Sequence, residues 1–277
     1  MTPANPIPRF RRDLTFSSII QSGLFVAAFV AMLLSVMPGG AIVGNLLFAG
    51  IVVAWLALSY RSAKSSRINA DSPGLIAAGR FREAEQRIEG VVGSFGLFRN
   101  VKLVGLHHLA LLRHAEKRFH DSAALCQLIL RQRLGGVKGL AKPTRLILAD
   151  SAMEMGDVRG AYDAIASLYR ERLSLTEALT LLNVQSDYLM RIGAWDQLFD
   201  LIERKASLAE LMPPTAAART QAMLALAARR LGREDWANWL RKRVELLVDP
   251  NELIAQRPML AELWTPAPQA DLPAGNA

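Results

Sequence analysis

Two long apolar stretches near the N-terminus constrain this chain more than any other feature. Residues 16–37 and 41–60 contain no Asp, Glu, Lys or Arg. Each has the roughly 20 apolar residues that a helix needs to cross a bilayer. The turn Pro38-Gly39-Gly40 separates them. We therefore predict a two-helix transmembrane hairpin over residues 16–60, with spans at 16–37 and 41–60.

The basic residues on either side of this hairpin predict its orientation. The segment 1–67 holds six basic residues against Asp13 alone, a net of +5 out of the total of +8. The turn between the spans has no basic residue, so the positive-inside rule predicts that both termini are cytoplasmic. The brevity and layout of the chain favour a cell inner membrane. With most of the excess charge beside lipid, nucleic acid is not an expected partner. The residues expected to set topology and contact lipid headgroups are Arg9, Arg11, Arg12, Arg61, Lys64 and Arg67.

Small residues recur every four positions in the first span. Such a stripe allows close packing of a second helix, and we predict that it contacts the second span. Asn45 and Gln21 are the most polar residues at membrane depth. They are expected to hydrogen-bond across helices or near the headgroups, and an ion pathway is disfavoured because neither ionises. The predicted packing residues are Gly23, Ala27, Ala31, Ser35 and Asn45.

The remainder of the chain predicts helices of ordinary length and no strand. Ser72-Pro73 and Pro213-Pro214 are typical helix starts, because proline is tolerated in the first turn. No run of alternating polar and apolar residues indicates a strand. The predicted class is all-α. Residues 1–15 are expected to be a disordered basic N-terminus, and residues 61–71 a basic juxtamembrane linker.

A motif repeats along this helical part at a nearly constant period. Its best copies are Gly79-Arg80-Phe81 with Ala84 and Gly156-Asp157-Val158 with Ala161. Glycine at the anchor suits the positive φ of a tight turn between helices. The five anchors are Gly79, Lys117, Gly156, Gly193 and Gly232, which gives a period of about 38.

The register extends beyond the anchor and predicts how the helices pack. The residue seven positions before each anchor is small, as expected where two helices approach closely. The residue nine positions after it is apolar in four copies of five. The small set is Ser72, Ala110, Ala149, Ser186 and Ala225, and the second set is Ile88, Cys126, Ile165, Ile202 and Arg241.

On this motif the chain resembles the tetratricopeptide repeat (TPR) family. The resemblance covers residues 72–250 and implies a TPR-like α-solenoid of about five helical pairs. The period is longer than that family's usual period of about 34 residues, and a generic solenoid of helical pairs stays open as an alternative. A membrane anchor followed by such repeats is also similar in layout to the bacterial HemY-type proteins. Residues 251–264 are expected to form a capping helix, and residues 265–277 a disordered tail.

The resemblance also implies a partner-binding groove. In TPR proteins the side chains about ten, six, three and two positions before the turn point into the concave face. A solvated helix surface is the alternative for each position. The polar groove candidates are His107, His114, Asp150, Glu154, Asn183, Asp187, Arg191, Arg229 and Arg230.

No cluster of residues indicates catalysis. His107 and His114 are seven positions apart, about 11 Å along a helix, which is too far for them to share a zinc ion. Cys126 lies at a recurrent apolar position and is expected to be a buried structural thiol. The glycine-rich segment 135–139 lacks the ending of a phosphate-binding loop and is expected to be a mobile linker. We therefore expect no metal, no cofactor and no enzymatic activity.

Two functions fit this reading. The first is a membrane-tethered scaffold or adaptor whose repeats bind a protein partner on the cytoplasmic face. The second is an accessory or assembly subunit of a larger membrane complex, in which the hairpin itself is the interface.

Overall fold

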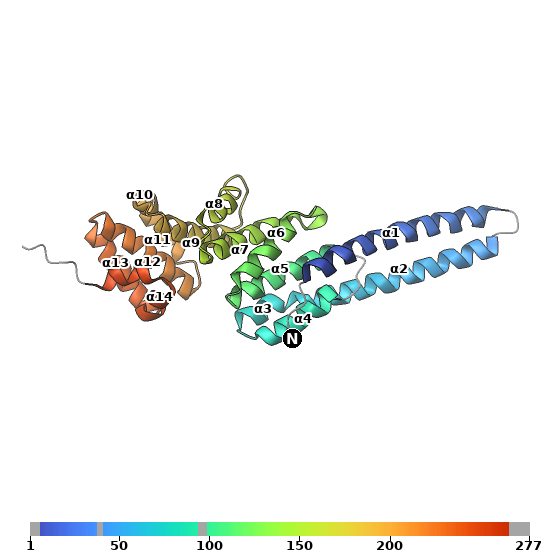
Figure 1. The fold of residues 1–277 in the computed structure, drawn as a ribbon, viewed down its shortest axis with the longest axis horizontal. Coiled ribbons are helices and arrows are strands. Elements are labelled where there is room, and N and C mark those ends of the chain that lie inside the picture. The colour runs from blue at the N-terminus through green and yellow to red at the C-terminus, as the bar shows by residue number, and fades with distance from the viewer. Residues whose placement is uncertain (1–5, 38–40, 94–98, 266–277) are drawn as a thin grey trace, which may run out of the picture. The chain divides into compact units, whose positions relative to one another are not determined.

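The computed structural model describes residues 6–37, 41–93 and 99–265, with side chains described from residue 22 onward and at Ile19, except at Ala41. This part of the chain is helical throughout and contains no strand, which confirms the all-α prediction (Figure 1). It divides into two compact units, unit 1 (Met1–Met155) and unit 2 (Gly156–Ala277). The predicted tail after residue 265 lies outside the described residues.

Unit 1 begins with two long helices, α1 (Pro6–Val36) and α2 (Ala41–Ala70), which pack against each other side by side (Figure 1). α1 starts at Pro6, so the prediction of disorder is wrong for residues 6–15; a helix tolerates prolines in its first turn. The predicted linker 61–71 is helical up to Ala70. It contains no glycine or proline to end α2.

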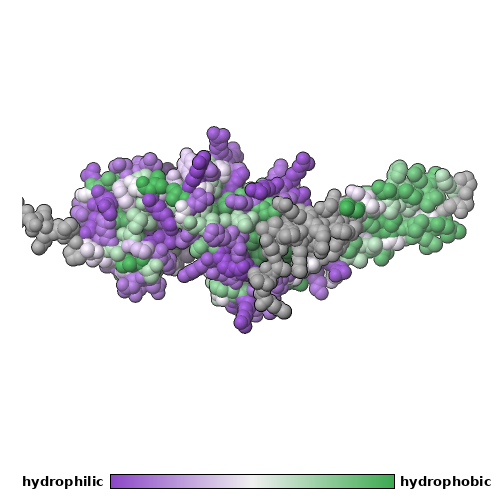
Figure 2. Space-filling model, in the orientation of Figure 1, coloured by the Kyte–Doolittle hydropathy of each residue, from purple (hydrophilic) through white to green (hydrophobic). Residues whose placement is uncertain are grey.

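The surface of this helix pair is mostly apolar over residues 22–37 and 42–60 (Figure 2). The exposed basic residues Arg61, Lys64 and Arg67 follow near the end of α2. One helical stretch among the described residues, Ile42–Ala77, which comprises α2 and the helix after it, is long and apolar enough to cross a membrane. Almost none of its apolar window is buried. The apolar helix Ser22–Val36, within α1, is shorter. A second span therefore stays a prediction.

α1 and α2 approach each other closely at Gly44. A Cβ built there would overlap the backbone nitrogen of Ser35 and lie 2.8 Å from the carbonyl oxygen of Ala31. Ala31 is fully buried and Ser35 is half-buried. Ala31 and Ser35, which belong to the predicted stripe, therefore face α2. Gly44, whose missing side chain allows this close approach, was not among the predicted packing residues.

The other predicted packing residues lie elsewhere. Gly23, Ala27 and Asn45 are exposed, and a Cβ at Gly23 would meet nothing within 4 Å. On this end of α1 the half-buried residues are Leu24 and Ala28. A step of four residues turns about 40° beyond a full circle, so a strict four-residue stripe drifts away from the line along which two straight helices touch.

The rest of unit 1 is a set of shorter packed helices. Their bounds are α3 (Ser72–Ala77), α4 (Phe81–Gly93), α5 (Arg99–Ala115), α6 (Phe119–Leu130), η1 (Gly135–Leu140) and α7 (Ala141–Glu154). α3 starts at the predicted Ser72, with proline in its first turn. The core of this set includes the fully buried Ile88, Leu103 and Ile129. The glycine-rich segment expected to be a mobile linker forms η1, and Val137 packs against this core.

Unit 2 is built around one alanine-rich helix, α12, which starts at the predicted Pro214. Residues 220–228 of α12 are all buried, because α9, α10, α11, α13 and η2 pack around it. The bounds are α8 (Val158–Ala166), α9 (Leu175–Arg191), α10 (Trp195–Phe199), α11 (Ile202–Ala209), α12 (Pro214–Arg230), α13 (Glu234–Leu247), α14 (Pro250–Gln256) and η2 (Pro258–Trp264).

The predicted capping helix 251–264 is two short helices rather than one. α14 ends before Arg257, because the following Pro258 disfavours helical backbone at the preceding residue and supplies no N–H. Leu253, Leu260 and Leu263 are buried in the same core as α12. The segment therefore covers the last helical pair of unit 2, as expected, but with a break.

All five repeat anchors have the same backbone conformation. Their φ angles are 72° at Gly79, 61° at Lys117, 76° at Gly156, 70° at Gly193 and 69° at Gly232. In four of the turns the next N–H donates to the carbonyl five residues back, at 2.8–2.9 Å, as in a Schellman motif. The small residue seven positions before each anchor is buried. The period read from the sequence is thus a period of helix-ending turns.

Candidate functional site

The predicted groove residues of unit 1 brace α5 against α7. The Nδ1 of His107 lies 3.0 Å from the Oγ1 of Thr144, which donates its own proton to the carbonyl of Leu140 at 2.7 Å. The threonine oxygen therefore accepts from Nδ1–H. Burial, with a smaller contribution from the neighbouring His108, lowers the pKa of His107 to about 4. His107 is a neutral, buried structural group near pH 7.

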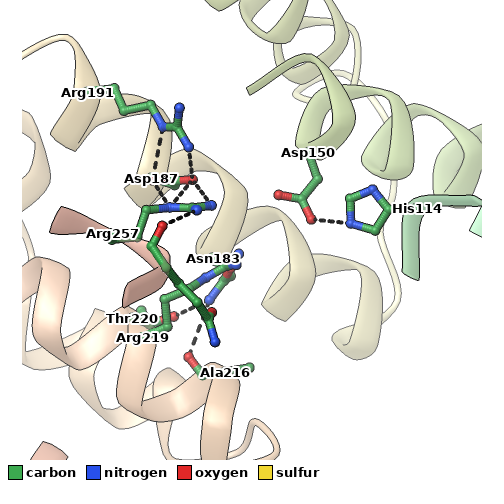
Figure 3. A network of polar contacts seen from close by, with 10 residues as sticks. His114, Asp150, Asn183, Asp187, Arg191, Ala216, Arg219, Thr220 and Arg257 are labelled. Carbon is green, nitrogen blue, oxygen red and sulfur yellow. Dashed lines mark hydrogen bonds and ion pairs between the residues drawn. The ribbon is translucent and has the colours of Figure 1, made fainter. Parts of the chain in front are cut away.

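His114 and Asp150 form the second brace of unit 1 (Figure 3). The Nε2 of His114 lies 3.0 Å from a carboxylate oxygen of Asp150, and its Nδ1 lies 3.0 Å from the Oγ of Ser151. Ser151 in turn donates to Ser122 at 3.1 Å, and Ser122 donates to the carbonyl of Ala110 at 2.9 Å. Both ring nitrogens thus face acceptors, and a hydrogen-bonded chain connects α7 to α6 and α5.

Asn183 makes the equivalent connection in unit 2, between α9 and α12 (Figure 3). Its amide donates to the Oγ1 of Thr220 at 2.8 Å and to the carbonyl of Ala216 at 3.3 Å, and Arg219 donates to its carbonyl oxygen. The 37-residue separation of Asn183 and Thr220 equals that of His107 and Thr144. His107 and Asn183 thus occupy the same repeat position, ten residues before a turn anchor. Each links the first helix of its pair to the first helix of a later pair, α5 to α7 and α9 to α12.

Asp187 is the most deeply buried of the predicted groove residues, with no exposed side-chain surface. The Nη2 of Arg257 lies 2.8 Å from its Oδ2, and the Nε of Arg257 lies 3.2 Å from both oxygens (Figure 3). The Nε of Arg191 lies 3.4 Å from Oδ1. A buried carboxylate needs such a hydrogen-bonded cation, and removing one partner of a buried pair typically costs about 3–5 kcal/mol.

The two arginines at the end of α12 hold the C-terminal segment of unit 2. Arg229 donates to the carbonyls of Glu262 at 2.6 Å and Thr265 at 2.8 Å. Arg230 pairs with the carboxylate of Glu262 at 2.5 Å, and its guanidinium lies 5.7 Å from the ring centre of Trp195. The remaining groove candidate, Glu154, is half-buried and also has an interaction partner. All nine candidates therefore have interactions within the chain.

A cavity of about 300 Å³ lies beside the C-terminal segment. Its guanidinium groups are already engaged: Arg229 binds the two carbonyls, and Arg241 approaches the carbonyl of Leu263 at 3.4 Å and Glu245 at 3.8 Å. No nucleophile with an adjacent base lines it. The lining residues are Arg229, Glu234, Ala237, Asn238, Arg241, Leu263, Trp264 and Thr265.

Three tyrosines of unit 2 form an aromatic surface that sequence reasoning missed. Tyr162 of α8 and Tyr188 of α9 have ring centres 5.9 Å apart. Tyr169 follows α8; partial burial raises its pKa, and proximity to the other two rings raises it further. Tyr162 and Tyr169 are 50% and 56% exposed. Tyrosines spaced seven and nineteen residues apart give no motif, so only the folded chain assembles them.

The predicted headgroup residues of α2 are accessible on its surface, and their contact with lipid stays a prediction. Arg61, Lys64 and Arg67 are exposed. The side chains of Arg9, Arg11 and Arg12 lie outside the described residues. Cys126 is fully buried, and burial raises the pKa of its thiol to about 12, which agrees with the expected structural role.

Several partners of the groove candidates were missed, and a signal existed for some. His107, His114 and Asn183 contact Thr144, Ser151 and Thr220, each 37 residues later, a separation close to the anchor spacing of about 38. Arg257 and Glu262 lie outside the repeats and carried no such signal.

No family model, curated protein or solved structure matches this chain. The resemblance to TPR proteins therefore depends on the turn motif and the register alone, and the arrangement of the helical pairs as a solenoid stays a prediction.

Proposed function

We propose that this chain is a membrane-tethered scaffold that has no enzymatic activity. A hairpin of two spans anchors it in a cell inner membrane, and TPR-like helical pairs on the cytoplasmic side bind a protein partner. Confinement to the same surface raises the effective concentration of anchor and partner, so a modest affinity suffices for stable assembly.

The observation that carries this proposal is the apolar surface of α1 and α2. Phe25, Leu46 and Val53 are 76%, 69% and 65% exposed, whereas Leu224 and Leu226 of α12 are fully buried. Soluble monomers rarely expose a continuous apolar patch this long. Because all backbone groups within a helix are paired, a helix satisfies the requirement for crossing lipid.

The partner contact is best placed on the tyrosine surface of Tyr162, Tyr169 and Tyr188. The polar groove candidates already brace the helices, and a partner that replaced those contacts would leave buried polar groups unpaired. The exposed Tyr162 and Tyr169, with the half-buried Tyr188 beside them, provide apolar ring area together with polar hydroxyls, the combination enriched at protein interfaces. No buried group has to be released for a peptide or a helix to pack there.

Cross-linking in native membranes, followed by identification of the captured proteins, tests the scaffold. The double variant Tyr162→Ser/Tyr169→Ser is expected to lose a partner that the wild-type chain and a Trp239→Ser control retain. Trp239 is a matched control because it is 43% exposed on α13. Finding no protein whose capture depends on the two tyrosines would reject this contact. Recovery of the chain from the soluble fraction after ultracentrifugation without detergent would reject the anchor.

The alternative, a subunit of a larger membrane complex, gains support from a separate observation. Gly23 and Ala27 are exposed on α1 rather than packed against α2, so a third helix has access to them. The double variant Gly23→Leu/Ala27→Leu discriminates the two functions. A scaffold keeps its soluble partner in this variant, whereas a subunit that assembles through the hairpin dissociates from its complex in mild detergent.

A further inference from the structure

A long segment of unit 1 contains basic residues and no acidic ones. Between Asp121 and Asp150 there is no Asp or Glu, while several residues are Lys or Arg. Three of these, Arg131, Arg133 and Lys138, lie in the connection from α6 through η1 to α7. They are exposed and pair with no carboxylate in the described part of the chain. Their charge is available to an external anion.

Contacts at the start of α5 place this connection. Arg99 donates to the side chain of Gln132 at 2.8 Å, and a Cβ at Gly136 would lie 3.1 Å from the amide nitrogen of Asn100. The connection from α6 therefore lies beside the first turn of α5. A Cβ at Gly105, six residues further along α5, would lie 3.9 Å from the amide of Asn69 on α2. Six helical residues span about 9 Å.

The direction of α5 relative to α2 follows from α4. Arg87 of α4 reaches Asp71, just after α2, at 3.5 Å, and Val92 lies 3.2 Å from the Cβ position of Gly105. The chain thus turns back along α2 in α4, and α5 starts at the end of unit 1 from which α1 and α2 extend (Figure 1).

Distances along α2 then show that the basic connection after α6 lies at the same position along the helix axis as Arg61 and Lys64. Moving about 9 Å from Asn69 toward the hairpin reaches residue 63, beside Lys64 and Arg61. The predicted end of the second span, Tyr60, is only about 5 Å further. The connection after α6 therefore lies at the depth where a bilayer that contains this span has its headgroups.

We propose that Arg131, Arg133 and Lys138, together with Arg61 and Lys64 of α2, form a surface that binds the anionic headgroups of the bilayer holding the hairpin. This inference rests on the proposed membrane anchor and adds a second attachment far from it in sequence. Exposed cations near an anionic leaflet are attracted over about one Debye length. The contact fixes how unit 1 is held against the membrane instead of leaving it free to pivot about α2.

Hydrogen exchange of the full-length chain in lipid nanodiscs tests this surface. One set of discs contains phosphatidylcholine alone, and the other also contains phosphatidylglycerol. Each headgroup-bound cation contributes about fivefold in affinity, so we expect amides of residues 131–142 to exchange at least about fivefold more slowly in the anionic discs. High salt is expected to remove the difference by screening.

Two charge-matched variants complete the experiment. Arg131→Gln/Arg133→Gln/Lys138→Gln is expected to exchange equally fast in both discs, whereas Arg170→Gln/Arg204→Gln/Lys242→Gln, with three exposed cations of unit 2 removed, is expected to behave like the wild type. Equal exchange of the wild-type segment in both discs overturns the inference, as does loss of protection in both variants. Flotation of the wild-type chain with the discs tests the membrane anchor independently of hydrogen exchange, and failure to float would overturn the anchor.

Discussion

The helix pairs α1–α2 and α12–α13 both contain many apolar residues, but these residues are mostly exposed in α2 and buried in α12. In α12 the residues from Thr220 to Ala228 are buried on every side. In α2 Gly44 is buried, while the apolar residues from Leu46 to Leu56 are almost all exposed. Leucine and alanine are frequent in both segments. What differs is the surroundings of each pair: α12 has five neighbouring elements, whereas the apolar side chains of α2 are exposed and, under the proposed anchor, would face lipid.

This difference shows which sequence signal separates the two cases. Hydrophobicity alone does not, because α12 contains nine consecutive buried residues and still belongs to a packed unit. The distribution of charge does: α13 contains Arg241, Lys242 and Arg243, whereas residues 16–37 and 41–60 contain no charge. A helix pair that must face water on one side carries charges there.

The largest expected effect comes from the same substitution made in each pair. Leu226→Ala in α12 removes a fully buried side chain and is expected to destabilise unit 2 by about 3–5 kcal/mol, through lost burial and the cavity left behind. Leu46→Ala in α2 is expected to change unfolding in mild detergent by no more than about 0.5 kcal/mol. Denaturant titration followed by circular dichroism measures both. Equal losses would mean that α2 is packed against protein.

Acidification is expected to affect the packed helices and to leave the apolar hairpin unchanged. The folded-state pKa of His107, about 4, is below the ordinary histidine value of 6.5, so the unfolded chain binds the proton more tightly. The stabilisation is complete above about pH 6.5 and is lost as the pH falls toward 4, by up to about 3 kcal/mol. Thermal unfolding between pH 7 and pH 4 measures the loss.

Two asparagine variants assign this pH dependence. His107→Asn is expected to flatten it, because the titrating group is gone. His120→Asn, which changes an exposed histidine of the same unit, is expected to leave it unchanged. An unaltered profile in His107→Asn would place the titration elsewhere, with the half-buried His108 as the next group to test, since partial burial lowers its pKa too.

A smaller effect is expected where α1 and α2 touch. Gly44→Leu forces the helices apart, because even a Cβ at this position overlaps the backbone of Ser35; we expect a loss of about 1–3 kcal/mol. Gly50→Leu is the control on the same helix, where a Cβ meets nothing within 4 Å. Cross-linking of cysteines introduced into α1 and α2 compares the two variants. Equal cross-linking would show that the pair does not depend on close backbone approach.

The smallest effect is a gain at the one turn anchor that is not glycine. Lys117 has a φ of 61°, a conformation that costs a residue with a Cβ but not glycine. Lys117→Gly is therefore expected to stabilise the α5–α6 pair by about 0.5–1 kcal/mol, less the entropy that glycine gains in the unfolded chain. Thermal unfolding measures the gain, and Lys138→Gly in η1 serves as a control. A loss of stability would show that the lysine side chain contributes to packing.

Local features of the fold could be predicted from the sequence because they are encoded locally. The five turns follow from one motif, and Lys117 was placed among them by spacing despite its side chain. The starts of α3 and α12 follow from Pro73 and Pro214. The small residues before each turn were expected at helix contacts and are buried there.

The roles of polar side chains could not be predicted in the same way. Asp187 was assigned to a groove, yet its partner Arg257 lies 70 residues away, in a segment with no repeat register. The stripe that begins at Gly23 has the spacing of a packing face, but the angle between consecutive members carries it off the contact line. Both cases depend on which surfaces meet in three dimensions, and spacing within one helix does not determine this.

The burial of Cys126 gives the protein its own reporter of opening. The chain has one cysteine, and its thiol is shielded inside unit 1 with almost no thiolate at neutral pH. A maleimide reagent will modify it only during excursions that separate α6 from its neighbours. The labelling rate of the wild-type protein therefore measures how often α6 opens, in detergent or in intact membranes, with no engineered probe.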